Sequence, residues 1–161
     1  MTQLLRINSS SRLTGSHSAA IADAFEAGFR AKHPACTGIT RNVANGSIPF
    51  IAQSTIEGFY APQEKLSGDQ KAATALSDKL IAEIQASDTL LLAVPIYNFT
   101  IPEALKAWVD QICRIGHTFA MDENGFQGLV KARRAIVVAH TARKATTLLN
   151  RSELRTSFSP I

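Results

Sequence analysis

The stretch VPIYNFTIPEALKAWVDQI, residues 94–112, decides the fold of this 161-residue chain. The apolar run at residues 88–94 has the composition of a central strand in a parallel sheet, buried on both faces. Pro95 ends that strand, because proline fixes the backbone and donates no hydrogen bond. Pro102 suits the first position of a helix, whose positive end favours Glu103. The sequence therefore predicts a strand, a rigid aromatic turn and a helix in succession.

Short strands and helices alternate along the rest of the chain. This order predicts an α/β fold, in which an open parallel sheet is covered by helices on both faces. The length suits one domain with a hydrophobic core. Further strands are predicted at residues 3–7, 38–43 and 135–139.

Two further helices have recognisable starts. Ser16 or Ser18 can cap the first helix, and the sequence SGDQ at residues 67–70 forms a capping box for the second. Residues 44–62 contain turn residues and apolar residues without a clear period, which predicts an irregular connection that packs against the core. The buried face of the first helix is expected to contain Ala20, Ile21, Ala24, Phe25 and Phe29.

Composition narrows the class of protein. Hydrophobic residues make up 45% of the chain, yet no apolar run approaches membrane-spanning length. The N-terminal apolar run is too short for a secretory signal, so a cytoplasmic location is expected. Cys36 and Cys113 match no metal-binding spacing. Cys113 falls on the apolar side of a predicted helix and is interpreted as a buried free thiol.

The net charge of +4 does not indicate a nucleic-acid partner. Residues 142–161 hold four basic residues and one acid, which accounts for +3 and leaves +1 on residues 1–141. No basic stripe with interleaved aromatics occurs in that larger part. We therefore divide the chain into a domain at residues 1–141 and a basic tail at residues 142–161.

Two predicted strand ends carry unusual side chains. The first strand is followed by Ser9, Ser10 and Ser11, and then by GSHS at residues 15–18. Hydroxyls and free amides at a helix N-terminus can bind a phosphate group. The loop lacks the GxGxxG and GxxxxGK[ST] patterns of nucleotide cradles. A polar loop with a serine cap is the alternative interpretation.

The second strand end is PIYNF, residues 95–99. Its free amides, the Asn98 amide group and two aromatic side chains could contact the rim and faces of a flat heteroaromatic ring. A turn with two packing aromatics is the alternative. Ligands of open α/β sheets bind beyond the carboxyl ends of the strands, so both segments are expected to face one crevice.

Three segments resemble those of the FMN-dependent NADH:quinone oxidoreductases, also called FMN-dependent azoreductases, which have a flavodoxin-like fold. The segments are INSSSRLTGSHS, PIYNFTIPEALKAWVDQICRIGHTF and DENGFQGLVKARRAIVV, at residues 7–18, 95–119 and 122–138. The long middle segment is the specific one. The resemblance extends over residues 1 to 140 and implies a flavodoxin-like open parallel sheet with FMN as cofactor.

The resemblance also implies roles for single residues. Phe119 and Met121 would approach the substrate side of the flavin, although relatives often carry an aromatic residue where Met121 stands. The residues that would hold the FMN phosphate are Ser10, Ser16, His17 and Ser18. The residues that would line the flavin ring are Ile96, Tyr97, Asn98 and Phe99.

The activity implied by the resemblance is a ping-pong transfer of a hydride from NADH, through FMN, to a quinone or an azo compound. No catalytic side chain is required, and His33, His117 and His140 have no Asp and Ser partners by spacing. They are interpreted as structural or solvent-facing. The family is homodimeric with flavin sites near the subunit interface, and the same is expected here. No metal, nucleic acid or membrane is expected as a partner, and the choice between NADH and NADPH stays open.

The C-terminal sequence departs from the family pattern. Relatives carry a Ser/Thr-Arg-Gly-Gly turn after the last predicted strand, whereas this chain reads HTARKA at residues 140–145, without the two glycines. We hypothesise that the tail is altered or truncated, so that the last strand and helix of the fold are missing and FMN affinity is reduced. The alternatives are a flavodoxin-type electron carrier, disfavoured because carriers are usually acidic, and a remnant that binds no flavin.

Overall fold

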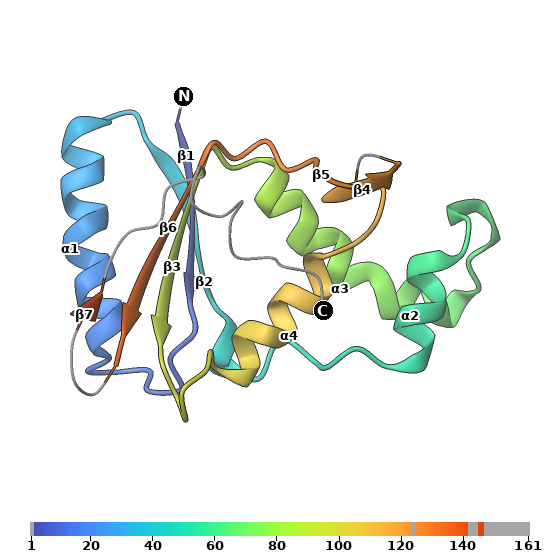
Figure 1. Cartoon of the computed structure of the whole chain (residues 1–161), viewed down its shortest axis with the longest axis horizontal. Coiled ribbons are helices and arrows are strands. Elements are labelled where there is room, and N and C mark those ends of the chain that lie inside the picture. The colour runs from blue at the N-terminus through green and yellow to red at the C-terminus, as the bar shows by residue number, and fades with distance from the viewer. Residues whose placement is uncertain (1, 124, 142–144, 147–161) are drawn as a thin grey trace.

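The computed structural model of this protein describes residues 2–123, 125–141 and 145–146. Its main sheet consists of β1 (Gln3–Asn8), β2 (Thr37–Asn42), β3 (Thr89–Pro95), β6 (Arg134–His140) and β7 (Ala145–Thr146). The strand order is β2-β1-β3-β6-β7 (Figure 1). The first four strands pair in parallel, and β7 pairs antiparallel with β6. The predicted open parallel sheet is confirmed.

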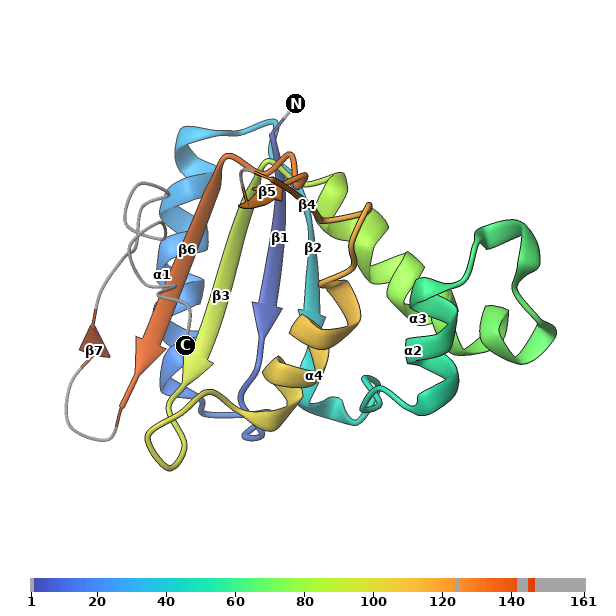
Figure 2. The same cartoon turned by 45° about the vertical axis from the view of Figure 1, so that its right-hand side comes forward.

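Helices cover both faces of this sheet (Figure 2). On one face lies α1 (His17–Lys32), and on the other lie α3 (Gly68–Gln85) and α4 (Glu103–Ile112). Outside α3 packs α2 (Gln53–Tyr60). The smaller elements are η1 (Val43–Asn45), η2 (Gln63–Lys65) and an antiparallel hairpin of β4 (Phe119–Asp122) and β5 (Gly125–Gly128).

The core has two parts, one on each side of β3. Every residue of β3 except Leu92 is buried, as its continuous apolar sequence predicts. The α1 side buries Leu4, Ala22, Leu91, Ala93, Ile136 and Val138. The larger α3 and α4 side includes Leu5, Ile7, Leu80, Ile84, Val94, Leu105 and Trp108.

The predicted buried face of α1 is only partly correct. Phe25 and Phe29 pack against the core, but Ala20, Ile21 and Ala24 are exposed, while Ser18 and Ala22 are buried instead. The reason is a buried cation on the sheet. Arg6 of β1 forms ion pairs with Asp23 at 2.6 Å and Glu26 at 3.1 Å, and donates to the Ala19 carbonyl at 3.1 Å. These partners hold the side of α1 that carries them against the sheet.

The irregular connection predicted at residues 44–62 was wrong in part, because it contains η1 and α2. Tertiary contacts stabilise α2. Gly58 lies against Thr74 of α3, and Phe59 packs under the Arg114 guanidinium at 4.6 Å from the ring centroid. The buried thiol predicted for Cys113 was also wrong, because α4 ends at Ile112 and Cys113 is exposed.

The helix starts follow the sequence signals closely. Ser16 caps α1, and Ser67 and Gln70 form the predicted capping box of α3. Pro102 is the N-cap of α4, one position before the predicted one. The predicted basic tail at residues 142–161 lies outside the described residues, apart from β7.

Candidate functional site

Two predicted binding segments meet at the carboxyl edge of the sheet, where β1, β3 and β6 end. Ser9 follows β1, and both its amide and its Oγ donate to the Ala93 carbonyl of β3, at 3.1 and 2.9 Å. Ser10 Oγ then lies 3.3 Å from the Tyr97 hydroxyl in the segment after β3. The structure therefore brings the serine loop and the aromatic segment into direct contact.

The start of α1 offers hydrogen-bond donors beside the serine loop. Ser16 accepts from the amides of Ala19 and Ala20, at 3.4 Å through Oγ and 3.0 Å through its carbonyl. Buried Ser18 places its Oγ 3.2 Å from Ser16 Oγ. Within the described residues, the amides of His17 and Ser18 donate to no protein acceptor. First-turn amides of this kind, at the positive end of a helix, can bind an anionic oxygen.

The aromatic segment is a tight reversal of the chain, here called the 97–100 turn. Tyr97 and Thr100 exchange backbone hydrogen bonds at 2.9 and 3.0 Å. The two residues between them have positive φ angles, 48° for Asn98 and 68° for Phe99. Asparagine tolerates this left-handed conformation, whereas phenylalanine resists it, so the turn stores strain of about 1–2 kcal/mol. Strained residues of this kind cluster at functional sites.

The two prolines frame the 97–100 turn. Pro95 is the last residue of the ladder with β6, and the following amide, of Ile96, donates to the His140 carbonyl at 2.8 Å. Pro102 is buried and begins α4. Between them Phe99 is fully exposed, with a relative accessibility of 103%. The turn therefore presents an aromatic ring and free backbone groups to solvent from a fixed base.

A pair of histidines joins the two sides of the site. The rings of His17 and His140 stack with centroids 4.9 Å apart and planes inclined by 26°. From the sequence, His140 was interpreted as structural or solvent-facing. Its position at the carboxyl end of the last predicted strand was the available signal, because such ends converge in an open α/β sheet.

The structure does not bring Phe119 and Met121 to the 97–100 turn of the same chain. They belong to the β4–β5 hairpin. The Gln85 side-chain amide, at the end of α3, donates to the carbonyls of His117 and Leu129 on either side of this hairpin, at 2.9 and 3.3 Å. The end of α3 adjoins the start of β3, at the opposite edge of the sheet (Figure 1). Met121 is 60% exposed there.

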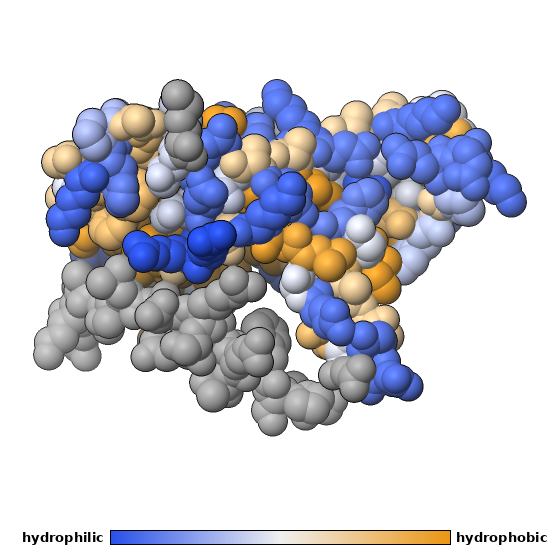
Figure 3. Space-filling view, turned by 90° about the horizontal axis from the view of Figure 1, so that it is seen from above, coloured by the Kyte–Doolittle hydropathy of each residue, from blue (hydrophilic) through white to orange (hydrophobic). Residues whose placement is uncertain are grey.

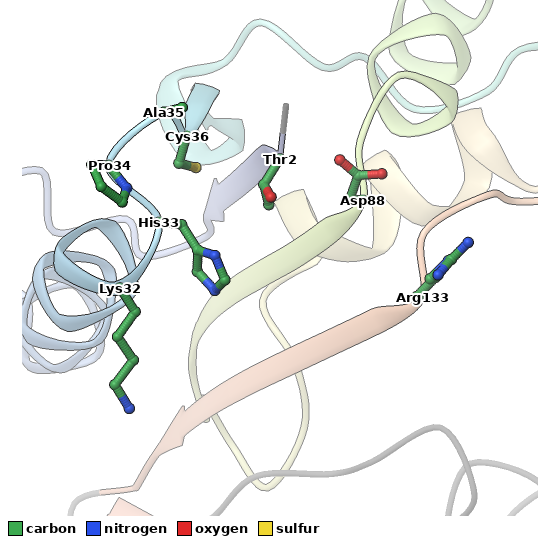
Figure 4. A pocket seen from close by; sticks show the side chains of 8 residues that line it. All are labelled: Thr2, Lys32, His33, Pro34, Ala35, Cys36, Asp88 and Arg133. Atoms are coloured by element: carbon green, nitrogen blue, oxygen red, sulfur yellow. The ribbon is translucent and has the colours of Figure 1, made fainter.

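A cavity of about 520 Å³ lies at the amino edge, where the strands of the sheet begin. Hydrophilic residues dominate the middle of this side of the molecule (Figure 3). In Figure 4 the His33 ring faces the middle of the cavity, between Lys32 and Arg133 on either side. The lining is open and polar, and it lies far from the predicted binding segments. The lining residues are Thr2, Lys32, His33, Pro34, Ala35, Cys36, Asp88 and Arg133.

The described part of the chain has neither a candidate metal-binding cluster nor a candidate membrane-spanning helix. In residues 2–123, 125–141 and 145–146, no group of three or more His, Cys, Asp or Glu side chains is arranged to hold a metal ion. No helix in the same residues is long and apolar enough to cross a membrane.

Comparison with known proteins agrees with the α/β fold described above. A family model described as flavodoxin-like fold matches residues 2–157. The azoreductase from Bacillus anthracis superimposes with a TM-score of 0.78 at 23% sequence identity, over 88% of this chain and 69% of that one. An FMN-dependent NADH-azoreductase from the same species, solved in complex with FMN, gives a TM-score of 0.70 at 21% identity, with the same coverage. The protein therefore has a flavodoxin-like fold.

Curated relatives place the chain more narrowly. The FMN-dependent NADH:quinone oxidoreductase of Xanthobacter autotrophicus is 44% identical over 137 residues, which cover 85% of this chain and 66% of that protein. The FMN-dependent NADH:quinone oxidoreductase 1 of Hahella chejuensis is 41% identical over 141 residues, covering 88% and 69%. The chain belongs to the FMN-dependent NADH:quinone oxidoreductase family, and it spans about two thirds of the length of these relatives.

Proposed function

We propose that this protein binds FMN at the carboxyl edge and transfers reducing equivalents from NADH to quinones or azo compounds. The observation that carries the proposal is the 3.3 Å contact between Ser10 Oγ and the Tyr97 hydroxyl. This contact joins two segments into one site: a loop that can bind a phosphate and a turn that can bind a flat ring. The names of the relatives support the choice of FMN and of a quinone or azo acceptor.

The phosphate end of the proposed site is formed by the serine loop and the start of α1. Ser10, Ser16 and Ser18 supply hydroxyls, and the amides of His17 and Ser18 are available as donors. The positive end of the α1 dipole adds to the attraction of an anion. Hydroxyls and first-turn amides at the positive end of a helix are the groups that a phosphate monoester requires.

The ring end of the proposed site is the segment from Ile96 to Phe99. Tyr97 is 38% exposed and Phe99 fully exposed, so both rings are available to cover a planar ligand. Asn98 carries an amide group that can both donate to and accept from the rim of a heterocycle. Backbone amides and the Asn98 side chain would stabilise negative charge on the reduced ring, since donors fixed by the turn need no reorganisation.

The chemistry that FMN supplies when bound is acceptance of a hydride from NADH and its transfer to a second substrate. The protein's part is to hold the ring against the 97–100 turn and to leave one face open for the two substrates. NADH would leave before a quinone or azo compound enters, which is a ping-pong cycle. No side chain of the described residues needs to act as a nucleophile in this scheme.

We also propose a homodimer. Within one chain the β4–β5 hairpin is remote from the 97–100 turn, so Phe119 and Met121 can approach a flavin only from a second copy. Phe126, at 77% exposure, and Met121 leave an apolar surface on that hairpin. The division into a cofactor-binding domain at residues 1–141 and a tail at residues 142–161 stays a proposal, and the cytoplasmic location stays a prediction.

The test is a flavin titration followed by turnover. FMN added to the purified full chain should lose fluorescence with a saturable dependence, and the complex should oxidise NADH with a quinone or an azo dye as acceptor. Parallel lines in a double-reciprocal plot would support the ping-pong order. Absence of saturable FMN binding by the full chain would overturn the proposed function. Light scattering that gives a monomer for the FMN-loaded chain would overturn the homodimer alone.

A further inference from the structure

His140 contacts both ends of the proposed FMN site. Its ring stacks on that of His17 at the start of α1, with centroids 4.9 Å apart. Its carbonyl accepts the Ile96 amide at 2.8 Å, at the base of the 97–100 turn. His140 is half-buried, and it is held in the parallel ladder opposite Pro95. Any change in the charge or position of this ring is therefore transmitted to His17.

Among residues 2–123, 125–141 and 145–146, the elements packed at this edge carry few charged or titratable groups. The serine loop carries Arg12, and the first two turns of α1 carry Asp23, already engaged in an ion pair. The 97–100 turn carries Tyr97. In the described part of the chain, His17 and His140 are the two imidazoles at this edge, and an imidazole can carry a positive charge.

Stacked imidazoles respond to an anion in a particular way. Two neutral rings stack favourably, whereas two imidazolium rings at this separation repel each other. A phosphate monoester carries a charge of about −1.5 to −2 at neutral pH and offsets that repulsion. Binding of the phosphate and uptake of protons by the pair are therefore coupled, each favouring the other.

We propose that His140 is a positioning residue that holds His17 against the cofactor phosphate and shares the positive charge that neutralises it. This inference rests on the proposed function, and its ligand class is a phosphate monoester. It predicts selection of FMN over riboflavin, which lacks the phosphate, and stronger selection when the imidazole pair is protonated. The role belongs to the ring of His140, since the carbonyl bond to Ile96 is independent of the side chain.

The first experiment compares FMN with riboflavin by fluorescence titration of the full chain at about pH 6.5 and about pH 8.5, where the phosphate keeps most of its charge. The FMN-to-riboflavin affinity ratio should be about tenfold higher at the lower pH, the size of one charge-assisted hydrogen bond. His140→Phe keeps an aromatic ring for stacking without the charge, and His140→Gln keeps a neutral polar group. Both should lose most of the pH dependence while riboflavin affinity is unchanged.

If His140→Phe behaves as the unsubstituted protein does, stacking alone suffices and the charge-sharing role is overturned. If both variants lose affinity for riboflavin and FMN equally, His140 is merely structural and the proposal is also overturned. Either result would leave FMN binding, and hence the proposed function, intact.

The second experiment needs no flavin. Inorganic phosphate is titrated into the flavin-free full chain, and the imidazole resonances of His17 and His140 are followed by NMR. Both rings should shift with one common midpoint, and in His140→Phe the His17 shift should require about tenfold more phosphate. Phosphate that shifts His17 but leaves His140 unmoved would overturn the inference, even if FMN binds. If the His17 and His140 resonances shift together but the chain does not bind FMN, the role of the pair in phosphate binding is upheld. Only the proposed FMN function is then overturned.

Discussion

Replacing Phe99 with glycine should raise the stability of the protein and lower its affinity for FMN. Phe99 has a φ of 68°, and its side chain is fully exposed. An L-residue in the left-handed region costs about 1–2 kcal/mol, which glycine avoids. Glycine loses about 0.5–1 kcal/mol through its greater freedom in the unfolded chain. Because no buried contact is lost, the free energy of unfolding should rise by about 0–1.5 kcal/mol, or about 0.75 kcal/mol at the midpoints of the two ranges.

The flavin effect has the opposite sign. An aromatic contact contributes about 0.5–1.5 kcal/mol beyond area burial, so Phe99→Gly should weaken FMN binding by about 2–12-fold. Urea unfolding can be followed through Trp108, the single tryptophan of the chain, which is 3% exposed. A thermal midpoint should rise by about 2 °C for a chain of this length.

Two control variants separate strain from ring contact. Phe99→Tyr keeps both the ring and the strain, so stability and FMN affinity should stay close to those of the unsubstituted protein. Phe99→Asn removes the ring but tolerates a positive φ, so it should follow the glycine variant in both measurements. A glycine variant that unfolds at lower urea concentration would refute the claim of strain. Unchanged FMN affinity in both Phe99→Gly and Phe99→Asn would refute the assignment of the turn to the flavin ring.

Three further predictions concern the scaffold. Gly58→Ala should destabilise the protein by about 1–3 kcal/mol, because the new Cβ would lie 2.6 Å from Thr74 Cγ2. Adding Thr74→Ser, which removes that methyl group, should restore most of the lost free energy of unfolding, as measured by urea unfolding. Ser67→Ala should cost about 1 kcal/mol by removing the α3 capping box, whereas exposed Ser47→Ala should be nearly neutral in the same assay. Partial desolvation of the sulfur and the Asp110 carboxylate raise the pKa of the Cys113 thiol, while Lys106 lowers it. Less thiolate is then present at a given pH, so iodoacetamide should alkylate Cys113 more slowly than a model peptide, and Asp110→Asn should accelerate the reaction.

Features of the fold that depend on local sequence were predictable. The end of β3 at Pro95, the start of α4 at Pro102 and the capping box at Ser67 each follow from one residue's backbone chemistry. The continuous apolar run of β3 likewise indicated its central place in the sheet. The positions of the serine loop and the aromatic turn on one edge followed from the parallel order of the strands.

Features that depend on contacts between distant residues were missed. The face of α1 is set by Arg6, which lies 17 and 20 residues from its acidic partners Asp23 and Glu26. The helix α2 is stabilised by Gly58, which fits against α3. Asn98 is a residue type that tolerates a positive φ, but nothing in the composition of the 97–100 turn indicated a second positive φ at Phe99. The stacking of His140 on His17 likewise joins the two ends of the described chain.

The two edges of the sheet differ in how completely their backbone groups are bonded. At the amino edge, Asp88 forms three hydrogen bonds, all 2.8–2.9 Å long. Its amide donates to the Gln3 carbonyl, and its carboxylate accepts from the Gln3 amide. Its carbonyl accepts from the Arg133 amide. At the carboxyl edge, the His17 and Ser18 amides have no acceptor among the residues that the structure describes, and Phe99 is exposed and strained. Donors without an acceptor weaken a free protein, and a ligand that accepts from them recovers part of that free energy on binding. This asymmetry supports the carboxyl edge, rather than the amino-edge cavity, as the proposed cofactor site.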